Sequence, residues 1–124
     1  ANSMAQAGAL TALTDPTVQQ DVQKMCERYD KRRRFMIQRL REIGFGITVE
    51  PTGAFYVFAN ARRFTNDSYA FAFEVLEKAG VGITPGIDFG PQGEGYIRFS
   101  YANSTANIAE GLNRLERYLT TRAH

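Results

Sequence analysis

The sequence predicts an α+β fold, in which a small, mostly antiparallel sheet packs against helices and is preceded by one long helix. Three observations favour this class. Apolar residues recur at three- and four-residue steps over residues 16–43 and 104–119, as on one face of a helix. Short stretches of alternating apolar residues lie between them, at residues 45–49, 54–58 and 96–101. Glycine and proline separate these stretches.

Two helices are predicted at the start of the chain. The first covers residues 3–13, which are rich in alanine and leucine. Asp15 and Pro16 match an N-cap followed by proline at the first helical position, so a second helix is expected over residues 16–43, with Gly44 ending it. Its apolar stripe comprises Val18, Val22, Met25, Tyr29, Met36, Leu40 and Ile43. At ~1.5 Å per residue the helix is roughly 40 Å long, and we expect one end to pack on something outside this chain.

A hairpin is predicted after the long helix. Phe45, Ile47 and Val49 alternate as in a strand, residues 51–53 form a turn, and residues 54–58 form the returning strand.

A helix, two strands and a last helix complete the expected order. Asn66 or Asp67 caps a helix through residue 79, and a short strand follows over residues 81–84. The next strand covers residues 96–101. The last helix begins after Ser104, and its buried stripe is expected at Ile108, Leu112, Leu115 and Leu119.

Composition excludes several classes of protein. The 124 residues, of which 44% are hydrophobic, suffice for one domain with its own core. A net charge of +2 is too small to indicate nucleic-acid binding, and no apolar run reaches the ~18 residues that span a bilayer. One cysteine and one histidine, Cys26 and His124, argue against a metal site of thiolates and imidazoles. We expect a cytoplasmic protein in which Cys26 is a buried structural thiol.

Arg98 is the residue that most strongly indicates function. Alternation along its strand places Ile97 and Phe99 on one face, and Tyr96, Arg98 and Ser100 on the other. A guanidinium among aromatic and apolar neighbours is costly unless it is paired, and its planar fork of donors fits a carboxylate in two parallel hydrogen bonds. From these residues alone, a ligand clamp and a solvated or salt-bridged arginine both stay open.

Two other features have plainer interpretations. The glycine-rich loop over residues 86–95 fits neither a P-loop nor a dinucleotide fingerprint, so a turn-rich connection is favoured over a phosphate cradle. The basic run over residues 31–34 points all round a helix and has Glu27 and Asp30 close by, so we interpret it as a solvated helix surface rather than a nucleic-acid patch.

Three motifs together resemble one family. They are Pro-x-Gly-Ala-Phe-Tyr at residues 51–56, Gly-Val-x-Ile-Thr-Pro-Gly-x-x-Phe-Gly at residues 80–90, and Gly-Glu-Gly-Tyr-Ile-Arg-Phe-Ser at residues 93–100. In this order they are similar to the C-terminal, small domain of the fold type I, class I/II aminotransferases of the aspartate aminotransferase kind. The resemblance implies an N-terminal helical segment at residues 1–16, in the interdomain and dimer region, and the small domain itself at residues 17–124.

The resemblance also implies a binding site. In this family the arginine of the last motif holds the α-carboxylate of the amino-acid substrate, a role that carries over to Arg98. It places Phe55 and Gly53 beside the substrate, and Pro85 and Gly86 at the strand exit next to the site. Asn2 and Ser3 would lie near the dimer interface.

The activity implied is the transfer of an amino group between an amino acid and a 2-oxo acid, by a homodimer that uses pyridoxal 5′-phosphate. The family's Schiff-base lysine lies in a large domain upstream of the residues matched here, and Lys24, Lys31 and Lys78 stand in the wrong context to replace it. We therefore expect this chain alone to hold no cofactor and to be inactive. The alternative is a free-standing carboxylate-binding or structural interaction domain without catalysis.

Overall fold

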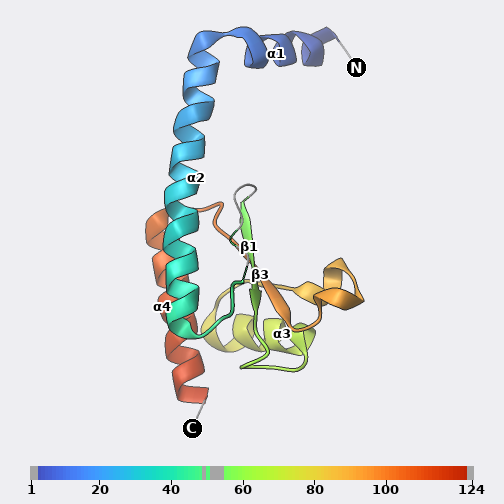
Figure 1. The fold of residues 1–124 in the computed structure, drawn as a ribbon, viewed down its shortest axis with the longest axis vertical. Helices are drawn as coiled ribbons and strands as arrows, with labels where there is room; N and C mark the ends of the chain where they lie inside the picture. The colour runs from blue at the N-terminus through green and yellow to red at the C-terminus, as the bar shows by residue number, and fades with distance from the viewer. Residues whose placement is uncertain (1–2, 49, 51–54, 123–124) are drawn as a thin grey trace. The chain divides into compact units, whose positions relative to one another are not determined.

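The computed structural model describes residues 3–48, 50 and 55–122, and the chain divides into two compact units, Ala1–Lys31 and Arg32–His124. The elements in chain order are α1 (Ser3–Thr14), α2 (Pro16–Ile43), β1 (Tyr56–Asn60), α3 (Ser68–Ala79), β2 (Thr84–Pro85), the 3-10 turns η1 (Gly86–Phe89) and η2 (Pro91–Gly93), β3 (Tyr96–Ser100) and α4 (Thr105–Arg122) (Figure 1). This order confirms the predicted α+β class. No helix of the described residues is long and apolar enough to cross a membrane.

The first unit contains α1 and the beginning of α2. Asp15 caps α2 as predicted, since its Oδ1 accepts a hydrogen bond from the Thr17 backbone N–H at 2.8 Å. Val22 and Met25 are exposed on α2, so the predicted apolar stripe has no cover over this part of the helix. Cys26 is exposed as well, and the prediction of a buried thiol is wrong because it assumed such a cover.

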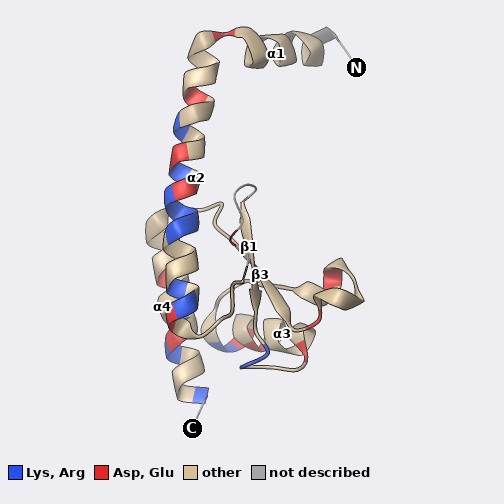
Figure 2. Cartoon of the chain, viewed as in Figure 1, with Lys and Arg blue, Asp and Glu red and all other residues tan. Residues whose placement is uncertain are grey.

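Charged residues of both signs follow one another along α2 (Figure 2). The basic run Lys31–Arg34 therefore belongs to a helix of mixed charge and not to an extended basic patch.

The sheet of the second unit has the strand order β1-β3-β2, with β3 antiparallel to both neighbours. Four of its residues that point to one face are almost completely buried: Val57, Ala59, Ile97 and Phe99. Helices cover this face with the buried residues Met36, Ile37 and Leu40 of α2, Phe71, Ala72 and Val75 of α3, and Ile108, Leu112, Leu115 and Leu119 of α4. The alternation predicted for β3 and the stripe predicted for α4 are both confirmed.

The helix boundaries follow from local capping. Asp67 caps α3 by accepting a hydrogen bond from the Ala70 N–H at 3.1 Å, and Gly80 ends the helix in the left-handed region at φ +70°. Ser104 caps α4 by accepting from the Asn107 N–H at 3.1 Å. These three caps were all predicted, because they depend only on neighbours within one turn.

Three strand predictions need correction. The strand expected at residues 45–49 is a single bridge between Gly46 and Asn60, although Phe45 and Ile47 are buried. The returning strand covers residues 56–60 instead of 54–58, and residues 49 and 51–54 lie outside those that the structure describes. Of the strand expected at residues 81–84, only Thr84 belongs to β2, which covers Thr84–Pro85. Pro85 is tolerated there because β2 is an edge strand, where no ladder N–H is needed.

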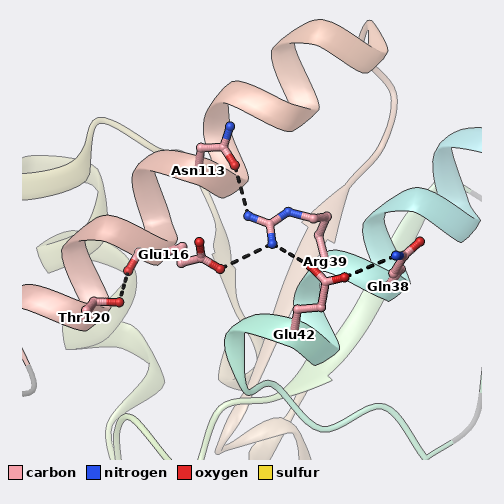
Figure 3. Close-up of polar contacts among 6 residues, drawn as sticks. All are labelled: Gln38, Arg39, Glu42, Asn113, Glu116 and Thr120. Atoms are coloured by element: carbon pink, nitrogen blue, oxygen red, sulfur yellow. Dashed lines mark hydrogen bonds and ion pairs between the residues drawn. The ribbon is translucent and has the colours of Figure 1, made fainter.

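Contacts between α2 and α4 fix the helical layer beside the sheet. The Arg39 Nη1 atom lies 2.7 Å from Glu42 Oε2 on its own helix and 3.3 Å from Glu116 Oε2 on α4, while its Nη2 donates to Asn113 Oδ1 at 3.0 Å (Figure 3). One guanidinium thus joins two helices that are far apart in sequence.

Tyr118 on α4 makes the fold less stable as the pH rises into the alkaline range. Burial, and then the neighbouring Glu74 carboxylate, raise the pKa of Tyr118 to about 12. An unfolded tyrosine ionises near pH 10, so the folded state binds this proton more tightly, and the resulting stability is fully present below about pH 10 and lost toward higher pH. We predict that the free energy of unfolding falls more steeply between pH 10 and 12 in the wild type than in Tyr118→Phe. Denaturant unfolding over this range measures both slopes, and equal slopes would contradict the assignment.

Candidate functional site

Arg98 lies in the middle of β3, the central strand. Its cross-strand partners are Phe58 on β1 and Thr84 on β2. The side chain is half-buried and points to the sheet face opposite Ile97 and Phe99. The position of Arg98 is therefore fixed by a strand with neighbours on both sides, which is a more rigid support than a loop.

Two aromatic rings contact the guanidinium of Arg98. Its Cζ atom is 5.1 Å from the centre of the Tyr56 ring on β1 and 4.8 Å from that of the Phe89 ring on η1. Each such cation–π contact is worth about 0.5–1 kcal/mol at an exposed site and more where water is excluded. Among the residues described, no carboxylate forms an ion pair with Arg98. Cation–π contacts are not hydrogen bonds, so they do not use up the N–H donors of the guanidinium.

Other aromatic residues extend this cluster across the sheet face. The Phe58 ring lies 5.6 Å from Phe89, 6.1 Å from Tyr56 and 6.4 Å from Tyr96, between ring centres. Phe55 is half exposed, and its ring lies 5.6 Å from that of Tyr56. The Arg98 guanidinium thus lies beside a cluster of aromatic rings. This apolar surrounding lowers the local dielectric constant and strengthens any hydrogen bond that Arg98 makes to an anion.

Close backbone packing explains the glycines that carry Phe89 to this position. A Cβ atom on Gly86 would lie 2.2 Å from the Gly93 carbonyl oxygen and 2.6 Å from that of Tyr96. A Cβ on Gly93 would in turn lie 2.1 Å from the Gly86 oxygen. The loop is a set of turns packed on its own backbone, which is the plainer of the two interpretations that the sequence allowed.

Glu94, in the same loop, anchors the site to α3. Its Oε1 accepts from the Ser68 backbone N–H at 2.7 Å and its Oε2 accepts from the Ser68 hydroxyl at 2.9 Å. Ser68 is completely buried, so this carboxylate satisfies polar atoms at the beginning of α3 that water cannot reach. The Cζ atom of Arg62 lies over the neighbouring Tyr96 ring, 5.1 Å from its centre.

The predicted site residues divide into three groups. Arg98 and Phe55 lie at the aromatic cluster, while Pro85 and Gly86 are buried where β2 passes into η1, the turn that ends at Phe89. Gly53 lies outside the described residues. Sequence reasoning missed Tyr56 and Phe89 as partners of Arg98 and Glu94 as the anchor. For Tyr56 a signal existed, because alternation along β1 places it on the face of Phe58.

The lysines of the sequence lie on other elements than Arg98. The sequence holds three lysines, Lys24 and Lys31 on α2 and Lys78 on α3, and none lies on the strands or turns that carry Arg98. No group of three or more His, Cys, Asp or Glu side chains in the described part of the chain could hold a metal ion. A guanidinium such as that of Arg98 is chemically suited to bind an anion.

Comparison with known proteins gives one consistent result. Residues 2–115 match the family model described as aminotransferase class I and II. The chain is 39% identical over 119 residues to the (5-formylfuran-3-yl)methyl phosphate transaminase of Methanocaldococcus jannaschii, covering 96% of this chain and 31% of the relative. It is 41% identical over 118 residues to an aspartate aminotransferase of Pyrococcus horikoshii, covering 94% of this chain and 30% of that relative. The chain thus spans about a third of the length of the curated relatives it matches.

The fold agrees with the sequence match. The crystal structure of an aromatic aminotransferase from Pyrococcus horikoshii OT3 superposes with a TM-score of 0.88 at 40% identity, over 93% of this chain and 30% of that one.

The Gly86–Gly93 contact gives a prediction about stability. Gly86→Ala should lower the free energy of unfolding by about 2 kcal/mol or more, because the clashing atoms are backbone and cannot rotate away. Gly111→Ala is the matched control, since nothing lies within 4 Å of its Cβ position on α4, and it should raise stability by about 0.5–1 kcal/mol. Urea denaturation measures both, and a Gly86→Ala variant as stable as the wild type would contradict the loop packing.

Proposed function

This chain belongs to the class I and II aminotransferases, and we propose that it acts in such an enzyme by binding the α-carboxylate of the amino-acid substrate through Arg98. The complete enzyme then transfers an amino group between an amino acid and a 2-oxo acid. One observation carries the proposal: the Arg98 guanidinium contacts the rings of Tyr56 and Phe89 and has no carboxylate partner among the residues described.

The geometry favours a carboxylate over other ligands. A planar guanidinium offers parallel N–H donors whose spacing matches the two oxygens of a carboxylate, with charge-assisted bonds of about 2.7–2.9 Å. Contacts of the Tyr56 and Phe89 rings with this group restrict its motion, so less entropy is lost when the substrate binds. Arg98 therefore orients the substrate, and its contribution to the rate is one of positioning.

The rest of the chemistry belongs to residues outside this chain in our proposal. Enzymes of this family depend on pyridoxal phosphate, which supplies the electron sink for the transfer. Because this chain spans about 30% of its relatives, we place the cofactor lysine and the large domain in the remaining part. This chain alone is then inactive as a transaminase.

Exposed apolar side chains fit a domain that is covered in the complete enzyme. Phe55, Ile87 and Phe89 are exposed in the second unit, next to the Arg98 site, and Met4 and Leu10 are exposed on α1. We assign the first group to contact with the large domain and the second to the interdomain or dimer region of a cytoplasmic homodimer, because such side chains are seldom left exposed in groups.

Replacement of Arg98 in the complete enzyme tests the proposal. Arg98→Ala should lower kcat/KM. The corresponding loss of transition-state stabilisation should be on the order of 2–5 kcal/mol, the scale for truncating one partner of a buried charge pair. Arg98→Lys should restore only part of this loss, since a point charge cannot reproduce the fork. Steady-state kinetics with an amino acid and 2-oxoglutarate measure the effect, with the thermal unfolding midpoint as the control for folding. A value of kcat/KM within a factor of about three of the wild type would refute the assignment.

The two rings give a second prediction for the complete enzyme. Phe89→Leu removes a cation–π contact but keeps an apolar side chain, and should lower kcat/KM roughly fivefold, or by about 1 kcal/mol. Tyr56→Phe keeps the aromatic ring at its position and is the matched control, expected to stay within about twofold. If Phe89→Leu leaves kcat/KM unchanged, the rings do not position Arg98.

A further inference from the structure

A cavity lies among α2, α4 and the turn that follows β1. It has a volume of about 620 Å³, and its lining includes Glu42, Arg63, Phe64, Glu116, Leu119 and Arg122. Arg98 is not among its lining residues, and it points to the opposite sheet face from Phe99, which borders another pocket together with Met36 of α2 and Ile108 of α4. The cavity is therefore separate from the carboxylate site proposed above.

The two carboxylates at this cavity already have cationic partners. Arg39 lies 2.7 Å from Glu42 and 3.3 Å from Glu116, and the Gln38 amide donates to Glu42 at 3.1 Å (Figure 3). Hydrogen bonds from Arg39 and then Gln38 lower the pKa of Glu42, so this carboxylate stays ionised and its charge is partly neutralised by Arg39. Arg39 thus offsets part of the negative charge of Glu42 and Glu116.

The two arginines at the cavity differ in their partners. The Cζ atom of Arg63 lies 5.9 Å from the centre of the Phe64 ring. Arg63 has no ion pair among the residues that the structure describes. Arg122 forms an ion pair with Glu74, with its Nε 3.6 Å from Glu74 Oε1, and its Cζ lies 5.3 Å from the centre of the Phe71 ring. Arg63 is therefore the cation at this cavity whose charge no described carboxylate neutralises in an ion pair.

The position of Arg63 also depends on a glycine. A Cβ atom on Gly44 would lie 2.8 Å from Arg63 Nη1 and 3.2 Å from the Phe64 ring. Gly44 has φ +122°, a conformation that side chains rarely adopt, so the end of α2 leaves open the space in which the guanidinium lies. Phe64 and Leu119 give the cavity an apolar wall beside this charge.

We propose that this cavity binds a small organic anion, whose carboxylate contacts Arg63 and Arg122 while its apolar body lies against Phe64 and Leu119. A polyanion is disfavoured, because Glu42 and Glu116 would repel the charges beyond the first. A bare inorganic anion would leave the apolar wall unused. The proposal does not rest on the function assigned to Arg98.

The test is an NMR titration of the full 124-residue chain, labelled with ¹⁵N, by 3-phenylpropionate. Amide shifts of Arg63, Phe64 and Thr120 report this cavity, while those of Phe58 and Arg98 report the sheet face, so the two sites are read separately. Exposed charges give modest affinity, so we expect saturation of the cavity shifts at up to about 10 mM. Inorganic phosphate and the neutral 3-phenylpropanol should each bind at least about fivefold more weakly.

Matched variants decide the outcome. Arg63→Gln should raise the dissociation constant about fivefold or more, whereas Arg62→Gln, the adjacent arginine that covers Tyr96 outside this cavity, should change it less than about twofold. Absence of shifts at the cavity amides would overturn the proposal. Shifts at the cavity that Arg63→Gln leaves unchanged, or phosphate binding as tight as that of 3-phenylpropionate, would overturn it as well.

Discussion

The alternation of side chains along β3 is the constraint on which the rest of this structure depends. Ile97 and Phe99 are buried against helices, and this fixes Arg98 on the other face of the same strand. A shift of one residue in register would bury the guanidinium and expose the core, so the register is set by the hydrophobic effect. The position of the functional side chain is therefore a consequence of how the core packs.

The two faces of the sheet have different chemistry for this reason. One is the core, closed by α2, α3 and α4. The other is an aromatic surface on which the rings of Tyr56 and Phe89 contact the Arg98 guanidinium. An arginine in this setting suits the recognition of a carboxylate, because cation–π contacts do not use up its N–H donors.

Sequence reasoning found those features that depend on near neighbours. The caps at Asp15, Asp67 and Ser104, the stripe of α4 and the alternation of β3 all follow from local patterns. It could not find contacts that depend on tertiary structure. Phe89 reaches Arg98 only because Gly86 and Gly93 pack backbone to backbone, and Glu94 meets Ser68 across 26 residues. The expected strand at residues 45–49 was wrong for a similar reason, since alternation indicates burial of Phe45 and Ile47 but not how many backbone pairs form.

The most direct test of the central claim is a crystal structure of the complete enzyme with a bound 2-oxo acid. The account predicts two hydrogen bonds of about 2.7–2.9 Å from Arg98 to the carboxylate next to the oxo group, with the Tyr56 and Phe89 rings still in contact with the guanidinium. A structure in which Arg98 pairs with a carboxylate of the protein, while another residue binds that of the ligand, would contradict it.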